Sequence, residues 1–205
     1  MKLKTYINKN FLKPKIKNKG KNNIINISKF AYLRKVFFKI YGSNNTIIIE
    51  DFVYLHKCTI TIGFSDYLID NCKVHIKKGS TCNSLVIQLG ESQSEVIIGE
   101  NCMISFGVEI SCTDTHSILD MDGNILNIGK NIEIGSHVWL CKKSTILKNT
   151  KIPNNSIVAQ GSIVTQKYDK ENIILAGNPA KIVKENINWT TKRPQEYISI
   201  SEKNK

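Results

Sequence analysis

The sequence predicts an all-β fold, a left-handed parallel β-helix, because two interleaved sets of residues recur at every sixth position. The first set is aliphatic and comprises Ile128, Ile134, Leu140, Ile146, Ile152, Val158 and Val164. The second set follows four residues later, is mostly small, and comprises Ile132, Val138, Ser144, Thr150, Ser156 and Ser162. A helix would scatter a period of six around its axis, and an ordinary strand repeats every two residues. A triangular coil of three hexapeptides instead points every aliphatic residue into one prism and leaves the small residues for the tight corners.

A looser repeat of 22 residues extends this solenoid toward the N-terminus. Tyr32-Leu-Arg-Lys35 and Tyr54-Leu-His-Lys57 are 22 residues apart, and turns such as Gly42-Ser-Asn-Asn45 precede runs of isoleucine. Glycine and asparagine suit left-handed corners, and continuous aliphatic runs suit strands buried in a parallel sheet. The solenoid is therefore expected to span residues 20–184, with its least regular coils at 70–95.

The period of six is interrupted at residues 113–127. This segment is polar and reads Thr-Asp-Thr-His-Ser-Ile-Leu-Asp-Met-Asp-Gly-Asn-Ile-Leu-Asn. Its Asp-Gly pair is typical of a turn, so we predict a loop extruded from one coil. Loops on a rigid scaffold commonly carry function.

The hexapeptide pattern ends after Val164. Pro179, within Gly177-Asn-Pro-Ala-Lys181, excludes a regular strand or helix interior at that point. Residues 185–205 are mixed and charged. We expect them to form a C-terminal cap with a short helix, because the open end of a solenoid otherwise exposes a sheet edge.

Length and composition favour one cytoplasmic domain. The chain has 205 residues, enough for a single sizeable core. It has no apolar run of the roughly 18 residues that span a bilayer, and its N-terminus lacks the apolar segment of a signal peptide. The cysteines show no C-x-x-C spacing, and they are expected to be reduced because the sequence shows no export signal. They are Cys58, Cys72, Cys82, Cys102, Cys112 and Cys141.

The positive charge is concentrated at one end. Residues 1–49 contain twelve Lys or Arg and no Asp or Glu, and the remaining 29 − 12 = 17 basic residues balance the 17 acidic ones. Residues 1–19 are expected to form a basic arm. Three interpretations stay open: a solvated arm, contact with a polyanion, or contact with the anionic inner face of the membrane.

Motifs in the C-terminal half resemble those of a known family. In order they are Ile98-Gly-Glu-Asn-Cys, Thr113-Asp-Thr-His-Ser-Ile118, Ile134-Gly-Ser-His-Val-Trp139, Gln160-Gly-Ser-Ile-Val-Thr165 and Ala176-Gly-Asn-Pro-Ala-Lys181. Over about residues 95–185 the chain resembles the hexapeptide-repeat acyltransferases, and most of all bacterial O-acetyltransferases of capsular and other surface polysaccharides, including polysialic acid. The resemblance implies a homotrimer with active sites between subunits and acetyl-CoA as co-substrate. No metal is expected.

His116 is the candidate catalytic residue. A sugar hydroxyl is a weak nucleophile at neutral pH, so one general base near neutrality is the main requirement for attack on a thioester. His116 lies in the polar loop and in the family motif. Asp114 is a candidate to orient the imidazole, to contact the acceptor or to cap the loop. Trp139 is expected to pack on the pantetheine or the acceptor, and Tyr168, which follows the last hexapeptide, is expected to cover the acceptor cleft.

The resemblance also implies a coenzyme site in the groove between neighbouring solenoids. Its expected residues are Trp139, Lys142, Gln160, Gly161, Thr165, Lys181 and Lys184. A backbone N–H near Lys142 would face the developing oxyanion, and Lys181 and Lys184 would meet the phosphates. Cys141 stands where the family usually has glycine. We favour a corner role for it over that of a nucleophile.

These observations predict acetyl transfer from acetyl-CoA to a sugar hydroxyl of a bacterial surface glycan, with an anionic polysaccharide as the preferred acceptor. The alternatives are N-acetylation of an amino sugar nucleotide and a non-catalytic binding solenoid. A γ-type carbonic anhydrase needs three histidines on zinc, and His56, His75, His116 and His137 lack that spacing. A nucleic-acid partner is not expected, because no recognised module accompanies the basic end.

Overall fold

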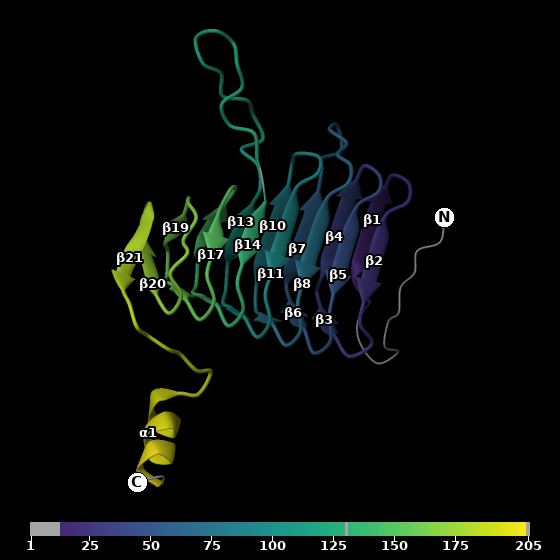
Figure 1. Cartoon of the computed structure of the whole chain (residues 1–205). Helices are drawn as coiled ribbons and strands as arrows, with labels where there is room; N and C mark the ends of the chain where they lie inside the picture. The colour runs from purple at the N-terminus through teal and green to yellow at the C-terminus, as the bar shows by residue number, and fades with distance from the viewer. Residues whose placement is uncertain (1–12, 130, 204–205) are drawn as a thin grey trace.

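The computed structural model describes residues 13–129 and 131–203 and shows a three-sided solenoid of parallel sheets (Figure 1). Sheet A contains β1 (Lys15–Lys19), β4 (Phe37–Tyr41), β7 (Cys58–Ile62), β10 (Leu85–Leu89), β13 (Val108–Ser111), β16 (Thr145–Leu147) and β19 (Ile163–Val164). Sheet B contains β2 (Ile24–Ile27), β5 (Thr46–Ile49), β8 (Lys73–Ile76), β11 (Glu95–Ile98), β14 (Ile132–Ile134) and β17 (Lys151–Ile152). Sheet C contains β3 (Tyr32–Arg34), β6 (Tyr54–His56), β9 (Thr81–Cys82), β12 (Met103–Ile104), β15 (Trp139–Leu140), β18 (Ile157–Val158), β20 (Ile174–Gly177) and β21 (Ala180–Lys184). The predicted left-handed parallel β-helix is confirmed.

The core is the column of aliphatic side chains inside the prism. From Ile134 to Val164, every predicted inward residue is at most 1% exposed. The looser N-terminal repeat forms coils of the same kind, since Tyr32 pairs with Tyr54 and Leu33 with Leu55 in parallel register. Ile128 is the exception to the predicted pattern. It is 58% exposed, because the chain at that point is still returning from the extruded loop.

The solenoid begins earlier than its sequence pattern suggests. Strand β1 pairs with β4 along its whole length, from Lys15 with Phe37 to Lys19 with Tyr41. Residues 15–19, expected in the basic arm, are therefore part of sheet A. Residues 1–12 of that arm lie outside the described residues.

Asparagine occupies many of the tight corners. Among the described residues, eight of the fifteen non-glycine residues with positive φ are asparagine, the side chain that tolerates this conformation best. Buried Asn45 shows how such side chains link the coils. Its amide donates to the carbonyl oxygen of Ile69 at 3.0 Å, and its side-chain oxygen accepts the N–H of Cys72 at 2.9 Å.

An antiparallel hairpin of β20 and β21 ends sheet C. The helix α1 (Pro194–Lys203) was expected to cap the open end, but it projects away from the prism below that hairpin (Figure 1). The segment between β21 and α1 instead packs along the side of the solenoid through Trp189, which is 9% exposed. Among the described residues, no helix is long and apolar enough to cross a membrane.

Candidate active site

The predicted loop leaves the prism between β13 in sheet A and β14 in sheet B (Figure 1). Its tip is a small hairpin in which Leu119 and Ile125 form an antiparallel bridge. Asp120 holds the turn, because its carboxylate accepts the backbone N–H groups of Asp122 and Asn124. The loop therefore has its own internal structure.

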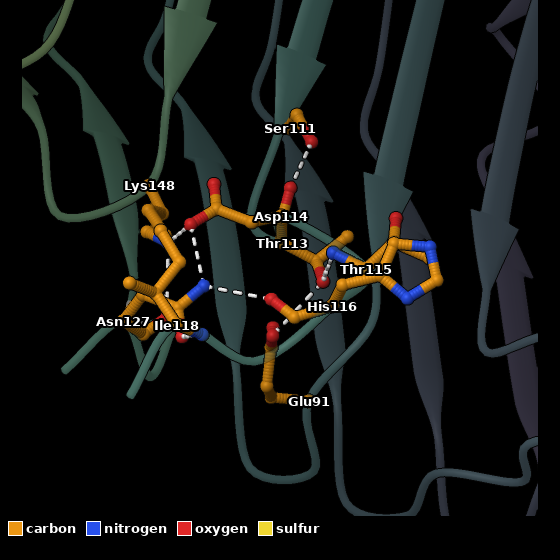
Figure 2. Close-up of polar contacts among 9 residues, drawn as sticks. All are labelled: Glu91, Ser111, Thr113, Asp114, Thr115, His116, Ile118, Asn127 and Lys148. Carbon is orange, nitrogen blue, oxygen red and sulfur yellow. Dashed lines mark hydrogen bonds and ion pairs between the residues drawn. The ribbon is translucent and has the colours of Figure 1, made fainter. Parts of the chain in front are cut away.

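One side of the loop base is fixed to the coil below by Glu91. The hydroxyl of Thr113 donates to Glu91 Oε1 at 2.9 Å and accepts the backbone N–H of Thr115 at the same distance (Figure 2). Thr115 has φ of +69°, which is unusual for a β-branched residue. These two hydrogen bonds hold the strained residue that directly precedes His116.

Glu91 forms part of the floor beneath the loop. A Cβ added to Gly129 would lie 2.5 Å from Glu91 Oε2, so the returning chain passes directly against this carboxyl group. Burial raises the pKa of Glu91, and the Thr113 hydrogen bond and the charge of Lys148 oppose that shift. Among the described residues, Glu91 Oε2 has no hydrogen-bond partner.

The other side of the base is a cluster of Asp114, Asn127 and Lys148. The Lys148 ammonium group forms an ion pair with Asp114 Oδ2 and donates to the Asn127 carbonyl oxygen at 2.9 Å. The Asn127 amide donates to Asp114 Oδ2 and to the His116 carbonyl oxygen, both at 2.8 Å (Figure 2). The hydrogen bond from Lys148 is the main cause of a lowered pKa at Asp114. Of the roles considered for Asp114, these contacts favour holding the loop.

His116 presents an exposed imidazole from this braced backbone. Figure 2 draws the ring on the other side of the loop backbone from the Asp114 carboxylate. The residue borders a pocket of about 310 Å³. The pocket is lined by Tyr67, Glu91, Thr115, His116, Ser117, Ile125, Asn127 and Ile128. A general base at the edge of an open pocket can reach a substrate hydroxyl.

Trp139 lies on a different side of the prism, on the outer face of sheet C. The Trp189 ring stands 5.9 Å from it, tilted by 42°. Trp189 also stacks on His137, with 4.2 Å between ring centroids, and its indole N–H donates to the His137 carbonyl oxygen at 2.8 Å. His137 is thus a structural residue that anchors the C-terminal segment beside Trp139.

No family model matches the sequence. A polysialic acid O-acetyltransferase of Neisseria meningitidis is 36% identical over 126 residues, covering 61% of this chain and 58% of that protein. A polysialic acid O-acetyltransferase of Escherichia coli O1:K1 / APEC is 38% identical over 105 residues, covering 51% of this chain and 34% of that protein. The matched region is thus less than two thirds of the length of either curated relative.

Two solved structures match nearly the whole solenoid. The polysialic acid O-acetyltransferase OatWY superposes with a TM-score of 0.78 at 29% identity, covering 92% of this chain and 95% of that one. The polysialic-acid-specific acetyltransferase NeuO has a TM-score of 0.69 at 30% identity, covering 91% and 86%.

The chain belongs to the hexapeptide-repeat acetyltransferase family. The likeness includes the N-terminal coils, which the sequence motifs matched only loosely.

In this family member, the expected coenzyme residues lie at the C-terminal coils. The N–H of Gly161 donates to the Lys142 carbonyl oxygen at 3.0 Å, so these two residues share one corner on successive coils. Gly161 has φ of +71°, and a Cβ there would meet nothing within 4 Å. The exposed members of the set are Lys142, Gln160, Gly161, Thr165, Lys181 and Lys184. Their role in coenzyme binding stays a prediction.

The surroundings of Tyr168 and Cys141 indicate that both side chains serve packing. Tyr168 is 6% exposed, and its hydroxyl donates to the Ala180 carbonyl oxygen at 2.5 Å, so it supports the terminal hairpin and does not line an open cleft. Burial raises the pKa of the Cys141 thiol to about 11. Such a thiol is almost fully protonated at neutral pH, which disfavours a nucleophilic role. Among the described residues, no group of three His, Cys, Asp or Glu side chains is arranged to hold a metal ion.

Sequence reasoning missed Glu91 and Trp189. Glu91 precedes Thr113 by 22 residues, the length of one coil in the N-terminal repeat, and that spacing could have placed the two side by side. No comparable signal identifies Trp189, because its segment lies outside the repeat. Its position depends on contacts with a residue 52 positions earlier.

Proposed function

We propose that the protein transfers an acetyl group from acetyl-CoA to a hydroxyl of an acidic bacterial surface polysaccharide. The observation that carries this proposal is the braced loop that presents His116 on a family scaffold. The two polysialic acid O-acetyltransferase structures cover more than nine tenths of the chain, which supports a related acceptor.

His116 acts as the general base in this reaction. It removes the proton of the acceptor hydroxyl as the oxygen attacks the thioester carbonyl, and a tetrahedral intermediate forms. The carbon–sulfur bond then breaks, and the imidazolium returns the proton to the coenzyme A thiolate. The acceptor leaves as an acetyl ester, and no covalent enzyme intermediate is needed. A backbone N–H at Lys142 stabilises the oxyanion.

The complete site requires a second copy of the chain. His116 projects from the corner between sheets A and B, whereas Trp139 lies on the face of sheet C. A three-fold ring would place the loop of one subunit against Trp139 and the Lys142 corner of its neighbour. Sedimentation at micromolar concentration should show a trimer, and a monomer alone would contradict this arrangement.

The coenzyme lies in the groove that such a ring creates. Gln160, Gly161 and Thr165 line its pantetheine and adenine parts. The exposed ammonium groups of Lys181 and Lys184 meet its phosphates, because charge-assisted hydrogen bonds suit that contact. Among these, Lys181 to Gln is expected to weaken coenzyme A binding and to leave the acceptor KM unchanged.

Thiol release from acetyl-CoA tests the reaction. The acceptors to compare are polysialic acid, polygalacturonic acid, dextran and an amino sugar nucleotide. We expect release with an acidic polysaccharide and an alkali-labile ester in the product. Release with the amino sugar nucleotide alone, giving an alkali-stable amide, would replace this proposal with N-acetylation. No release with any acceptor would favour a binding solenoid.

A further inference from the structure

A six-residue motif in the N-terminal coils has no part in the proposed reaction. Phe30-Ala-Tyr-Leu-Arg-Lys35 and Phe52-Val-Tyr-Leu-His-Lys57 are one coil apart and include strands β3 and β6 of sheet C (Figure 1). Leu33 and Leu55 point into the core. We name the outward residues the aromatic–cation ladder: Phe30, Tyr32, Arg34 and Lys35 on one coil, with Phe52, Tyr54, His56 and Lys57 on the next.

The aromatic rings of the ladder form a continuous surface across two coils. The Tyr32 and Tyr54 rings stack with centroids 4.8 Å apart and planes 11° apart. The Phe30 and Phe52 rings stack at 5.6 Å and 23°. Cross-strand aromatic pairs stabilise a sheet modestly, yet both phenylalanines remain more than half exposed. The fold therefore leaves the two phenylalanine rings exposed and the two tyrosine rings half-buried, and the Lys29 ammonium group lies 4.9 Å from the centroid of the Phe30 ring.

Cations surround these rings. Arg34 pairs with His56 in register, and Lys35 and Lys57 follow at the same corner. Partial desolvation lowers the pKa of His56, and the positive charges of Arg34, Lys57 and Lys35 lower it further.

Two acidic residues, Glu50 and Asp51, lie next to the ladder in sequence. Asp51 accepts a hydrogen bond from Ser28, and Glu50 pairs with His75 at 2.6 Å on the side of sheet B. The ladder itself contains Arg34, Lys35 and Lys57 and no Asp or Glu, so its own charge is positive.

Three residues of the ladder adopt a conformation that disfavours them. Lys35, Phe52 and Lys57 have φ of +56°, +58° and +53°. Among the described non-glycine residues, asparagine holds eight of the fifteen positions of this kind, and a bulkier side chain there costs about 1 kcal/mol. These strained residues direct two cationic side chains and one aromatic ring outward, which points to a function for those side chains.

The ladder is continuous with the proposed active site along one column of sheet C. Tyr54 pairs with Thr81, Thr81 with Met103, and Met103 with Trp139. Parallel strands are about 4.8 Å apart, so three steps place Tyr54 about 14 Å from Trp139 along the prism. An extended polymer that crosses the ladder can therefore continue to the cleft at Trp139.

We infer that the aromatic–cation ladder is a binding site for an acidic polysaccharide, separate from the catalytic cleft and leading toward it. The apolar faces of sugar rings pack on the tyrosine and phenylalanine rings. Sugar carboxylates pair with Arg34, whose guanidinium forms bidentate contacts, and with the two lysines. This inference rests on the proposed function for its choice of ligand. The column to Trp139 favours a glycan over single-stranded RNA, which also suits aromatic and basic surfaces.

Binding of long polysialic acid to the full-length protein, without acetyl-CoA, tests the ladder. The first variant is Arg34→Gln with Lys57→Gln, which leaves the strands intact. The second is Tyr32→Ala with Tyr54→Ala. We expect each to weaken binding about tenfold or more, because each removes two contacts of about 1 kcal/mol or above. The matched control is Lys17→Gln with Lys39→Gln, which removes the same charge from the same coils but on sheet A. The control should retain affinity within about twofold.

Equal losses of affinity in the ladder and control variants would mean that the overall positive charge of the coils binds the polymer, and would overturn the ladder as a specific site. Unchanged binding in both ladder variants, or tighter binding of polyuridylate than of polysialic acid, would overturn it as well. Sedimentation of the variants adds one more outcome: dissociated subunits would make the ladder an interface between copies.

Thiol-release kinetics keep the two proposals separate. The ladder variants should raise KM for long polysialic acid and leave kcat for a sialic acid trisaccharide unchanged. Glycan acetylation with normal KM in these variants would leave the proposed function standing without the ladder. If binding depends on the ladder but no glycan is acetylated, the ladder would stand as a binding site and the proposed function would fall.

Discussion

Lys148 and Asp114 form an ion pair across the base of the extruded loop, two residues before His116. The pair joins the loop to the coil that follows it and uses Asp114 Oδ2, the same oxygen that accepts the Asn127 amide. The carboxylate therefore braces the loop, and the imidazole is presented by the backbone.

Asn127 is predicted to be the most sensitive of the bracing residues. Its amide bonds to Asp114 and the His116 carbonyl oxygen, and its side-chain oxygen accepts the Ile118 N–H at 2.7 Å. Asn127→Ala should lower turnover about tenfold to a hundredfold, because a small misplacement of a catalytic group has effects of that size. Coenzyme A binding should be unchanged. Asn124→Ala, at the loop tip, is the matched control and should retain turnover. Equal effects of both changes would contradict a specific bracing role.

Glu91 is predicted to make stability fall as pH rises. Burial raises its folded-state pKa above the unfolded value, so the folded protein binds more protons in the window between the two values. Stability is then lost as pH rises through that window. Glu91→Gln keeps an acceptor for Thr113 and removes the charge. Its melting temperature should match that of the wild type near pH 4 and exceed it at pH 7.

The control for Glu91 is Glu109→Gln, an exposed carboxylate on β13. It should not show this pH-dependent difference. A Glu91→Gln variant that is less stable than the wild type at neutral pH would mean that the ionised carboxylate stabilises the loop base.

Trp189 is predicted to hold the C-terminal segment against sheet C. Trp189→Ala removes the stack on His137 and the indole hydrogen bond, and should lower the free energy of unfolding by about 3 kcal/mol. Trp189→Phe keeps an aromatic ring to stack on His137 and should lower the free energy of unfolding by a smaller amount. Limited proteolysis after Asn188 should be faster in the alanine variant. Resistance equal to that of the wild type would mean that other contacts anchor the segment.

The basic residues before the solenoid are predicted to act separately from the ladder. Because β1 begins at Lys15, deletion of residues 1–12 leaves sheet A intact. The truncated protein should lose binding to vesicles of anionic lipid and keep its KM for polysialic acid. In the wild type that KM should rise with salt, since screening weakens the positive field. A raised KM for polysialic acid with unchanged vesicle binding would mean that residues 1–12 contribute to binding of the acceptor.

The repeat made most of the fold predictable, because each coil buries the same kind of residue. The start at Lys15 was not predictable in this way. Strand β1 reads Lys-Ile-Lys-Asn-Lys, and its pairing with β4 uses backbone groups that any sequence supplies. Ile128 fits the six-residue period by coincidence. The loop at residues 113–127 happens to have a length that keeps the following coils in phase with the preceding ones.

The site was predictable where a local motif carries it. His116 and the loop are contiguous in sequence, so the polar segment identified both. The contacts of Glu91, Lys148 and Trp189 join residues that are 22, 34 and 52 positions apart. Burial of Tyr168 likewise follows from the terminal hairpin, which has no period of its own.

Thiol release from acetyl-CoA by His116→Ala, with polysialic acid as acceptor, tests the central claim most directly. The account predicts a fall in turnover on the order of 10²–10⁴-fold, with coenzyme A affinity and sedimentation unchanged. Turnover close to that of the wild type would contradict it, because another group would then be the general base.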